Sequence, residues 1–206
     1  AGSLERHRKD LEAYLSRHVD FGTSFRPVPV DREAPAIVRA MAEAAAEFDV
    51  GPMAAVAGAI AQHVGTDLLS LSPEVIVENG GDIFLAGKGQ RTVRVFAGTG
   101  GVDLDMAVNV EREGIGLCTT SAKVGPSLSL GAADAVTVLA RTASCADAAA
   151  SAIGNRVLVP GDIEAGLEVA RGHESVLGAV IQVEGSLGIW GSLRVVGGGH
   201  GHRTLL

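Results

Sequence analysis

Apolar residues spaced three or four positions apart predict three helices in the first third of the chain. The first begins at Ser3, a suitable N-cap, and the second opens at Pro35. The third spans Pro52 to about Val64 and is so rich in Ala and Gly that neighbouring backbones are expected to pack closely on several of its sides. Residues 21–31 carry two prolines and are expected to form an extended connector. Helices are therefore predicted over residues 3–64.

From residue 75 onward, short apolar runs alternate with glycine or charged turns, which is typical of strands. These runs indicate a mostly antiparallel meander over residues 75–78, 83–86, 92–97, 106–110 and 115–119. The rest of the core is expected to contain a strand at 135–140, an alanine-rich helix near 145–156, a helix capped by Asp162, and strands near 179–183 and 188–196.

Strands interrupted by helices, without strict alternation, predict an α+β fold. We expect a single layered domain over residues 1–196, with packed helices and a mostly antiparallel sheet in its core region, residues 74–196. Residues 197–206 are rich in Gly and His, and they are expected to be a flexible tail.

The composition of the chain argues against several classes of function. The 206 residues are 47% apolar and only 3% aromatic, and the net charge is −7, so the basic, stacking surface typical of nucleic-acid binding is not expected, nor is binding to anionic membranes. No apolar run approaches the roughly twenty residues of a membrane span. Cys118 and Cys145 follow no disulfide or zinc spacing, which fits a reduced, cytoplasmic setting. Small-residue helix faces are compatible with a homodimer.

The first candidate site is the segment Glu78, Asn79, Gly80, Gly81 and Asp82, which lies between two predicted strands. Glycines at a strand end allow positive φ and expose amide groups, while the carboxylates and the amide offer polar contacts to a ligand. The same segment is also typical of an ordinary tight hairpin. Both interpretations stay open at this point.

A second candidate is the strand end that carries Thr119, Thr120 and Ser121, whose hydroxyls and amides could contact a phosphate. The alternative is a threonine-rich strand that ends in a surface loop. Cys118 precedes these residues, but a catalytic thiolate needs a base, and no His lies near it in the sequence.

A third candidate is the pair Asp147 and Ser151, which helical spacing places one turn apart. Magnesium accepts one or two protein oxygens and completes its shell with water and phosphate oxygens, so this pair could hold it. Alternatively, Ser144 and Asp147 could form a capping box, in which Asp147 serves its own helix.

Four segments, taken in order, resemble the ApbE family and more closely its compact uncharacterised relatives: VENGGD at 77–82, GLCTTS at 116–121, DAVTVLA at 134–140 and ADAAASA at 146–152. The resemblance covers residues 50–190. It implies an ApbE-like fold, binding of FAD and magnesium, and transfer of FMN to a Ser or Thr of a target protein.

The resemblance also implies roles for single residues. Asp147 and Ser151 match the metal-binding Asp and Thr of the family, and the turn at 79–82 matches its ligand-contacting turn. Thr120 and Ser121 match its Thr-Ser-Gly strand end, although Ala122 replaces the Gly.

Two departures weaken the transferase expectation. The His-x-x-Asp-Pro loop of the family is missing, because residues 122–133 contain no His, and its Lys is missing from residues 53–57. Without an evident base, proton transfer loses about 10²- to 10⁴-fold. Two alternatives therefore stay open: a non-catalytic flavin-binding, metabolite-binding or assembly protein, and an enzyme that acts on a pterin or another phosphorylated metabolite.

Overall fold

The computed structural model describes residues 2–96, 101–121 and 131–198. These residues form a six-stranded sheet and a three-stranded sheet, and all neighbouring strands in both sheets are antiparallel. The large sheet has, in spatial order, β1 (Val75–Asn79), β2 (Asp82–Ala86), β5 (Ile115–Thr120), β6 (Ala135–Ala140), β7 (Val176–Val183) and β8 (Ser186–Gly191). The small sheet has β3 (Gly89–Val95), β4 (Leu104–Val110) and β9 (Arg194–Gly198).

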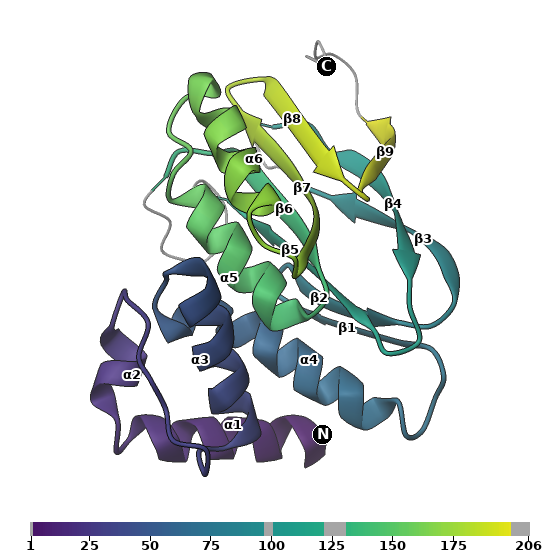
Figure 1. The fold of residues 1–206 in the computed structure, drawn as a ribbon. Helices are drawn as coiled ribbons and strands as arrows, with labels where there is room; N and C mark the ends of the chain where they lie inside the picture. Colours follow the sequence, from purple (N-terminus) through teal and green to yellow (C-terminus); the bar gives the residue numbers. More distant parts are fainter. Residues whose placement is uncertain (1, 97–100, 122–130, 199–206) are drawn as a thin grey trace.

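The helices form a layer on one face of the large sheet, and the small sheet lies on the other side (Figure 1). In chain order they are α1 (Gly2–Leu15), α2 (Val19–Thr23), α3 (Ala36–Phe48), the 3-10 turn η1 (Pro52–Ala55), α4 (Val56–Leu68), α5 (Ala143–Gly154), the 3-10 turn η2 (Pro160–Asp162) and α6 (Ile163–Arg171). The prediction of a single α+β domain with a mostly antiparallel sheet and packed helices is confirmed.

Alternation along the strands divides the core into two interfaces. Side chains such as Leu117 of β5 and Met106 of β4 fill the space between the two sheets. Side chains such as Cys118 and Val138 pack against the helices instead. These two faces matter for the site, because neighbouring residues of one strand belong to different interfaces.

The close packing expected of the third helix is confirmed for α4. A Cβ added at Gly58 would lie 2.1 Å from the carbonyl oxygen of Ala143 in α5. A Cβ added at Gly65 would lie 2.0 Å from the ring of Phe84 in β2. Glycine at these positions therefore lets α4 approach the backbone of α5 and the Phe84 ring of β2 closely.

Two expectations in the N-terminal region need correction. The connector predicted at 21–31 begins only at residue 24, because residues 21–23 form the end of α2, where Phe21 is fully buried and meets Tyr14 edge-on. Ser3 does not cap the first helix, because α1 begins one residue earlier. Its hydroxyl donates to Asp67 of α4 instead.

Two further corrections concern the second half of the chain. The strand expected at 188–196 is divided into β8 and β9, which belong to different sheets, and Gly191 with φ of +83° ends β8. Asp162 occupies the N-cap position of α6 as predicted, but its side chain makes no cap hydrogen bond. Its Oδ2 accepts instead from the amides of Leu158 and Val159 at 2.9 and 3.0 Å.

Within the described ranges, no single helix has the length and apolar character to cross a membrane. Of the expected glycine and histidine tail, residues 197–198 form the end of β9, and residues 199–206 lie outside the described residues.

Candidate functional site

The first candidate segment is a two-residue β-hairpin. Asn79 of β1 pairs with Asp82 of β2, and Gly80 and Gly81 between them have φ of +65° and +104°. Two consecutive positive φ angles suit the right-handed twist of a tight hairpin and strongly favour glycine. Glu78 supports the turn, since its Oε1 accepts from the Gly81 amide at 3.0 Å. The hairpin interpretation is therefore confirmed, and the hydrogen bond that supports the turn does not use the side chains of Asn79 and Asp82.

Strand alternation sorts the residues around this turn onto two faces. Asp82 pairs with Cys118 of β5, whose side chain lies in the helix-side core. Asn79, the pair partner of Asp82, shares that face, and its Nδ2 donates to the carbonyl of Ala57 at 3.1 Å. Glu78 alternates to the opposite face and is exposed.

Asp147 reaches the same place from α5. Its Oδ2 accepts from the amide of Gly58 at 3.0 Å, and the amide of Ala57 also donates to it. These amides belong to the first turn of α4, whose donors have no partner within the helix, and the N-cap residue Ala55 offers no side-chain oxygen. Asp147 therefore serves as a cap supplied by a neighbouring helix.

Three side chains converge at this point, and we call them the Asp82–Cys118–Asp147 cluster. One ligand atom of each, two carboxylate oxygens and a sulfur, lies within 4.8 Å of the others. Asp82 and Cys118 are buried, and Asp147 is partly exposed. The Oδ1 atom of Asp82 is buried and has no hydrogen-bond partner. Such an atom is costly unless something binds it, so it points to a ligand.

The electrostatics of the cluster favour neutral side chains when no cation is present. Burial raises the pKa of Asp82 to about 7. Burial, and then the charge of Asp82, raise the pKa of Asp147 well above its usual value, although the two α4 amides oppose this. Burial and the same two carboxylates raise the pKa of the Cys118 thiol. Near neutral pH, the cluster must therefore share protons or hold a cation.

The other predicted site residues lie on or next to β5 and on α5, outside the Asp82–Cys118–Asp147 cluster. Thr119 lies on the face toward the small sheet, where its Oγ1 is 3.0 Å from that of Thr137. Alternation returns Thr120 to the helix side, and Ser121 follows β5 half-buried. Ser151 is half-buried on α5, one turn beyond Asp147.

The capping-box alternative for Asp147 was wrong. The N-cap of α5 is Thr142, whose hydroxyl accepts from the amide of Cys145 at 3.2 Å. Ser144 is the second residue inside the helix, and its hydroxyl is 3.3 Å from that of Thr142. The carboxylate of Asp147 is thus free to face α4 and the sheet.

Sequence reasoning did not foresee Cys118 as a partner of the two carboxylates, nor the amides of Ala57 and Gly58. The hairpin and the predicted strand at 115–119 gave a partial signal for Cys118, because adjacent antiparallel strands place paired residues on one face. The register that joins Asp82 to Cys118 was the missing information.

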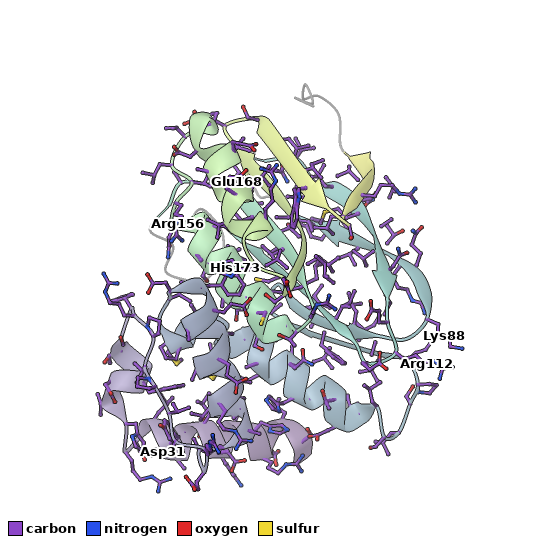
Figure 2. The ribbon with its side chains drawn as sticks, viewed as in Figure 1. Asp31, Lys88, Arg112, Arg156, Glu168 and His173 are labelled. Carbon is purple, nitrogen blue, oxygen red and sulfur yellow. The ribbon has the colours of Figure 1, made fainter. Side chains whose placement is uncertain are left out.

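A surface hollow lies at the other end of the β1–β2 hairpin, away from the cluster. It is lined by Leu69, Pro73, Glu74, Lys88 and Arg112. Figure 2 shows Lys88 and Arg112 near the connections between the strands at this end. The hollow contains none of the predicted site residues.

Comparisons with known proteins assign the chain to a family. The model of the family described as "AbpE bacteria" matches residues 1–184. A UPF0280 protein of Methanococcus maripaludis strain C7 is 46% identical over 153 residues, which are 72% of this chain and 62% of that protein.

Two other UPF0280 proteins match over a greater length. The one from Methanocaldococcus jannaschii is 40% identical over 91% of this chain and 79% of its own length. The one from Methanocella arvoryzae is 34% identical over 93% of this chain and 79% of its own length. Because the family model covers most of the chain and these relatives match nearly all of it, the chain belongs to the AbpE bacteria family, together with the UPF0280 proteins.

Proposed function

We propose that this protein binds a phosphate-bearing nucleotide, FAD or a relative of it, where the β1–β2 turn, the end of β5 and α5 meet. The observation that carries the proposal is the convergence of Asn79, Asp82 and Asp147 on one face of the sheet, with a buried carboxylate oxygen that has no partner. These residues come from the segments whose order resembles the ApbE family.

A divalent cation fits this place. Asp147 is partly exposed and one of its oxygens lies in the cluster, while Ser151 offers a hydroxyl one turn along α5. In the proposal, these two residues hold magnesium, and water and phosphate oxygens complete its shell. A bound cation would offset the repulsion between a pyrophosphate and the acidic side chains.

The described histidines favour binding over transfer. His7 lies 2.8 Å from Asp67, and its ring centroid is 5.1 Å from that of His63. His18 stacks on Tyr14, and His173 lies 3.6 Å from Glu47. No described histidine belongs to the cluster. An imidazole base for transfer chemistry is thus not found at the cluster within the described part of the chain.

One observation supports transfer of FMN to a Ser or Thr of a target protein as a second candidate. A general base works best when its pKa lies near the working pH, and burial brings the pKa of Asp82 to about 7. Asp82 would have to replace the missing His of the family in this role.

The test is a titration of the protein with FAD, with and without magnesium. Flavin fluorescence measures binding, and the amount of AMP released measures transfer. We expect FAD to bind more tightly with magnesium, and Asp147→Asn to weaken this gain at least tenfold while it keeps an acceptor for the Gly58 amide. The matched control is Asp10→Asn on the exposed face of α1.

Release of AMP that depends on magnesium and on Asp82 would establish transfer chemistry. Binding without release would establish the binding protein. Failure of FAD, FMN and AMP to bind under any of these conditions would refute the nucleotide proposal.

A further inference from the structure

The third member of the cluster has a chemistry that magnesium does not use. Magnesium binds oxygen ligands, whereas a thiolate favours zinc and other softer cations. Cys118 contributes the sulfur within 4.8 Å of both carboxylate ligand atoms. It is buried on the helix side of β5, so its position is set by the core.

We propose that Asp82, Cys118 and Asp147 together bind a thiophilic divalent transition cation of the zinc class. Two carboxylate oxygens and one sulfur supply three protein ligands, which leaves one position of a tetrahedral ion for water or a phosphate oxygen. The inference rests on the proposed function for the cation position at Asp147, but it puts a zinc-class ion held with Asp82 and Cys118 in place of magnesium held with Ser151. This cation site does not require a flavin.

The separations between the three ligand atoms are compatible with a zinc-sized ion. Zinc binds oxygen at about 2.0–2.2 Å and sulfur at about 2.3 Å, so its tetrahedral ligands lie roughly 3.3–3.8 Å apart. Because the three ligand atoms lie within 4.8 Å of one another, the contraction that zinc needs is at most about 1–1.5 Å. Asp82 and Cys118 are paired across β2 and β5, so the adjustment falls mainly on Asp147, which is partly exposed and gives an ion a way in.

The hydrogen bonding around the cluster suits cation binding. The amides of Ala57 and Gly58 orient the Asp147 carboxylate, as outer hydrogen bonds commonly do at metal sites. The Oδ1 atom of Asp82 would lose no hydrogen bond on binding a metal, because it has none.

Cobalt reports this site directly, because a thiolate bound to Co²⁺ gives a charge-transfer band in the near ultraviolet. The full chain, freed of metal with a chelator, is titrated with Co²⁺. We expect one equivalent to produce the band, stoichiometric Zn²⁺ to abolish it, and a thousandfold excess of Mg²⁺ to leave it intact.

Variants assign the band to the cluster. Cys118→Ser is expected to remove it, and Asp82→Asn to weaken Co²⁺ binding at least tenfold. The matched control, Cys145→Ser, changes the other thiol, which lies near Glu47, and is expected to keep the band. Substituting His200 and His202 with Ala removes two further metal-binding side chains of the sequence and is also expected to keep it.

X-ray absorption of the zinc-loaded wild type needs no variant, so it tests the site even if Cys118→Ser does not fold. We expect one sulfur at about 2.3 Å with oxygen neighbours. A zinc shell without sulfur, a band that survives Cys118→Ser, or displacement by Mg²⁺ would overturn the inference. FAD binding without a cobalt band would overturn this inference alone, whereas a band without FAD binding would overturn only the nucleotide proposal.

Discussion

Asp82→Asn is expected to stabilise the metal-free protein at neutral and alkaline pH. Asp82 is 7% exposed, and burial raises its pKa from 3.8 to about 7. Below pH 3.8 both the folded and the unfolded chain hold the proton. Between these two values only the folded chain keeps it, so the free energy of unfolding falls as the pH rises, and above about pH 7 the full cost of the buried charge is present.

The size of the effect follows from the same values. The difference between 3.8 and about 7, at about 1.36 kcal/mol for each pH unit, bounds the cost at about 4 kcal/mol. Asp147 titrates together with Asp82, so the two share this cost. Between pH 5 and pH 7 alone, wild type should lose up to about 3 kcal/mol that Asp82→Asn does not lose.

The assay is urea unfolding of chelator-treated protein at pH 5, 6, 7 and 8. Comparing slopes with pH removes any constant effect of the new amide. Asp10→Asn deletes the same charge at an exposed position and should keep the wild-type slope. Equal slopes for wild type and Asp82→Asn would refute the argument that burial of Asp82 destabilises the metal-free fold.

Three further substitutions test the structure around the cluster. Gly58→Ala should lower the stability of the protein in thermal unfolding by about 1–3 kcal/mol or more, because the new Cβ would lie 2.1 Å from a backbone oxygen of α5. The control, Gly161→Ala, has open space around it and should leave the stability unchanged. Equal effects of the two substitutions would contradict the packing of α4 on α5. Asp67→Asn should speed amide exchange in α1. Since hydrogen bonds lower the pKa of Asp67, its contribution should be present above pH 3.8 and fade as the pH falls through the lowered value, and exchange unchanged at pH 7 would contradict this. Thr120→Val should weaken FAD binding while Thr119→Val leaves it unchanged, and the reverse order would contradict the assignment of faces.

The general fold could be predicted because its signals are local. The hairpin at Gly80 and Gly81 follows from a glycine pair between two short β-forming runs, and the close packing of α4 follows from its small residues. The prediction of the N-terminal connector was wrong only at its start, where α2 extends to Thr23 and Phe21 is buried in the core. Tertiary burial of this kind overrides local propensity.

The candidate site was only half predictable, because its geometry depends on contacts between distant segments. Asp82 and Asp147 could be identified from their segments, but the chain passes through β3 and β4 between Asp82 and Cys118, so the register that joins them is not encoded locally. The role of Asp147 also depends on Thr142, which caps α5 in place of Ser144.

The position of a bound zinc ion distinguishes the Asp82–Cys118–Asp147 cluster from the Asp147 and Ser151 pair as the cation site. Crystals of the zinc-loaded protein, measured on both sides of the zinc absorption edge, locate the ion by its anomalous scattering. We expect a peak within bonding distance of Asp82, Cys118 and Asp147. A peak held by Asp147 and Ser151 without Cys118, or no peak at α5, would contradict it.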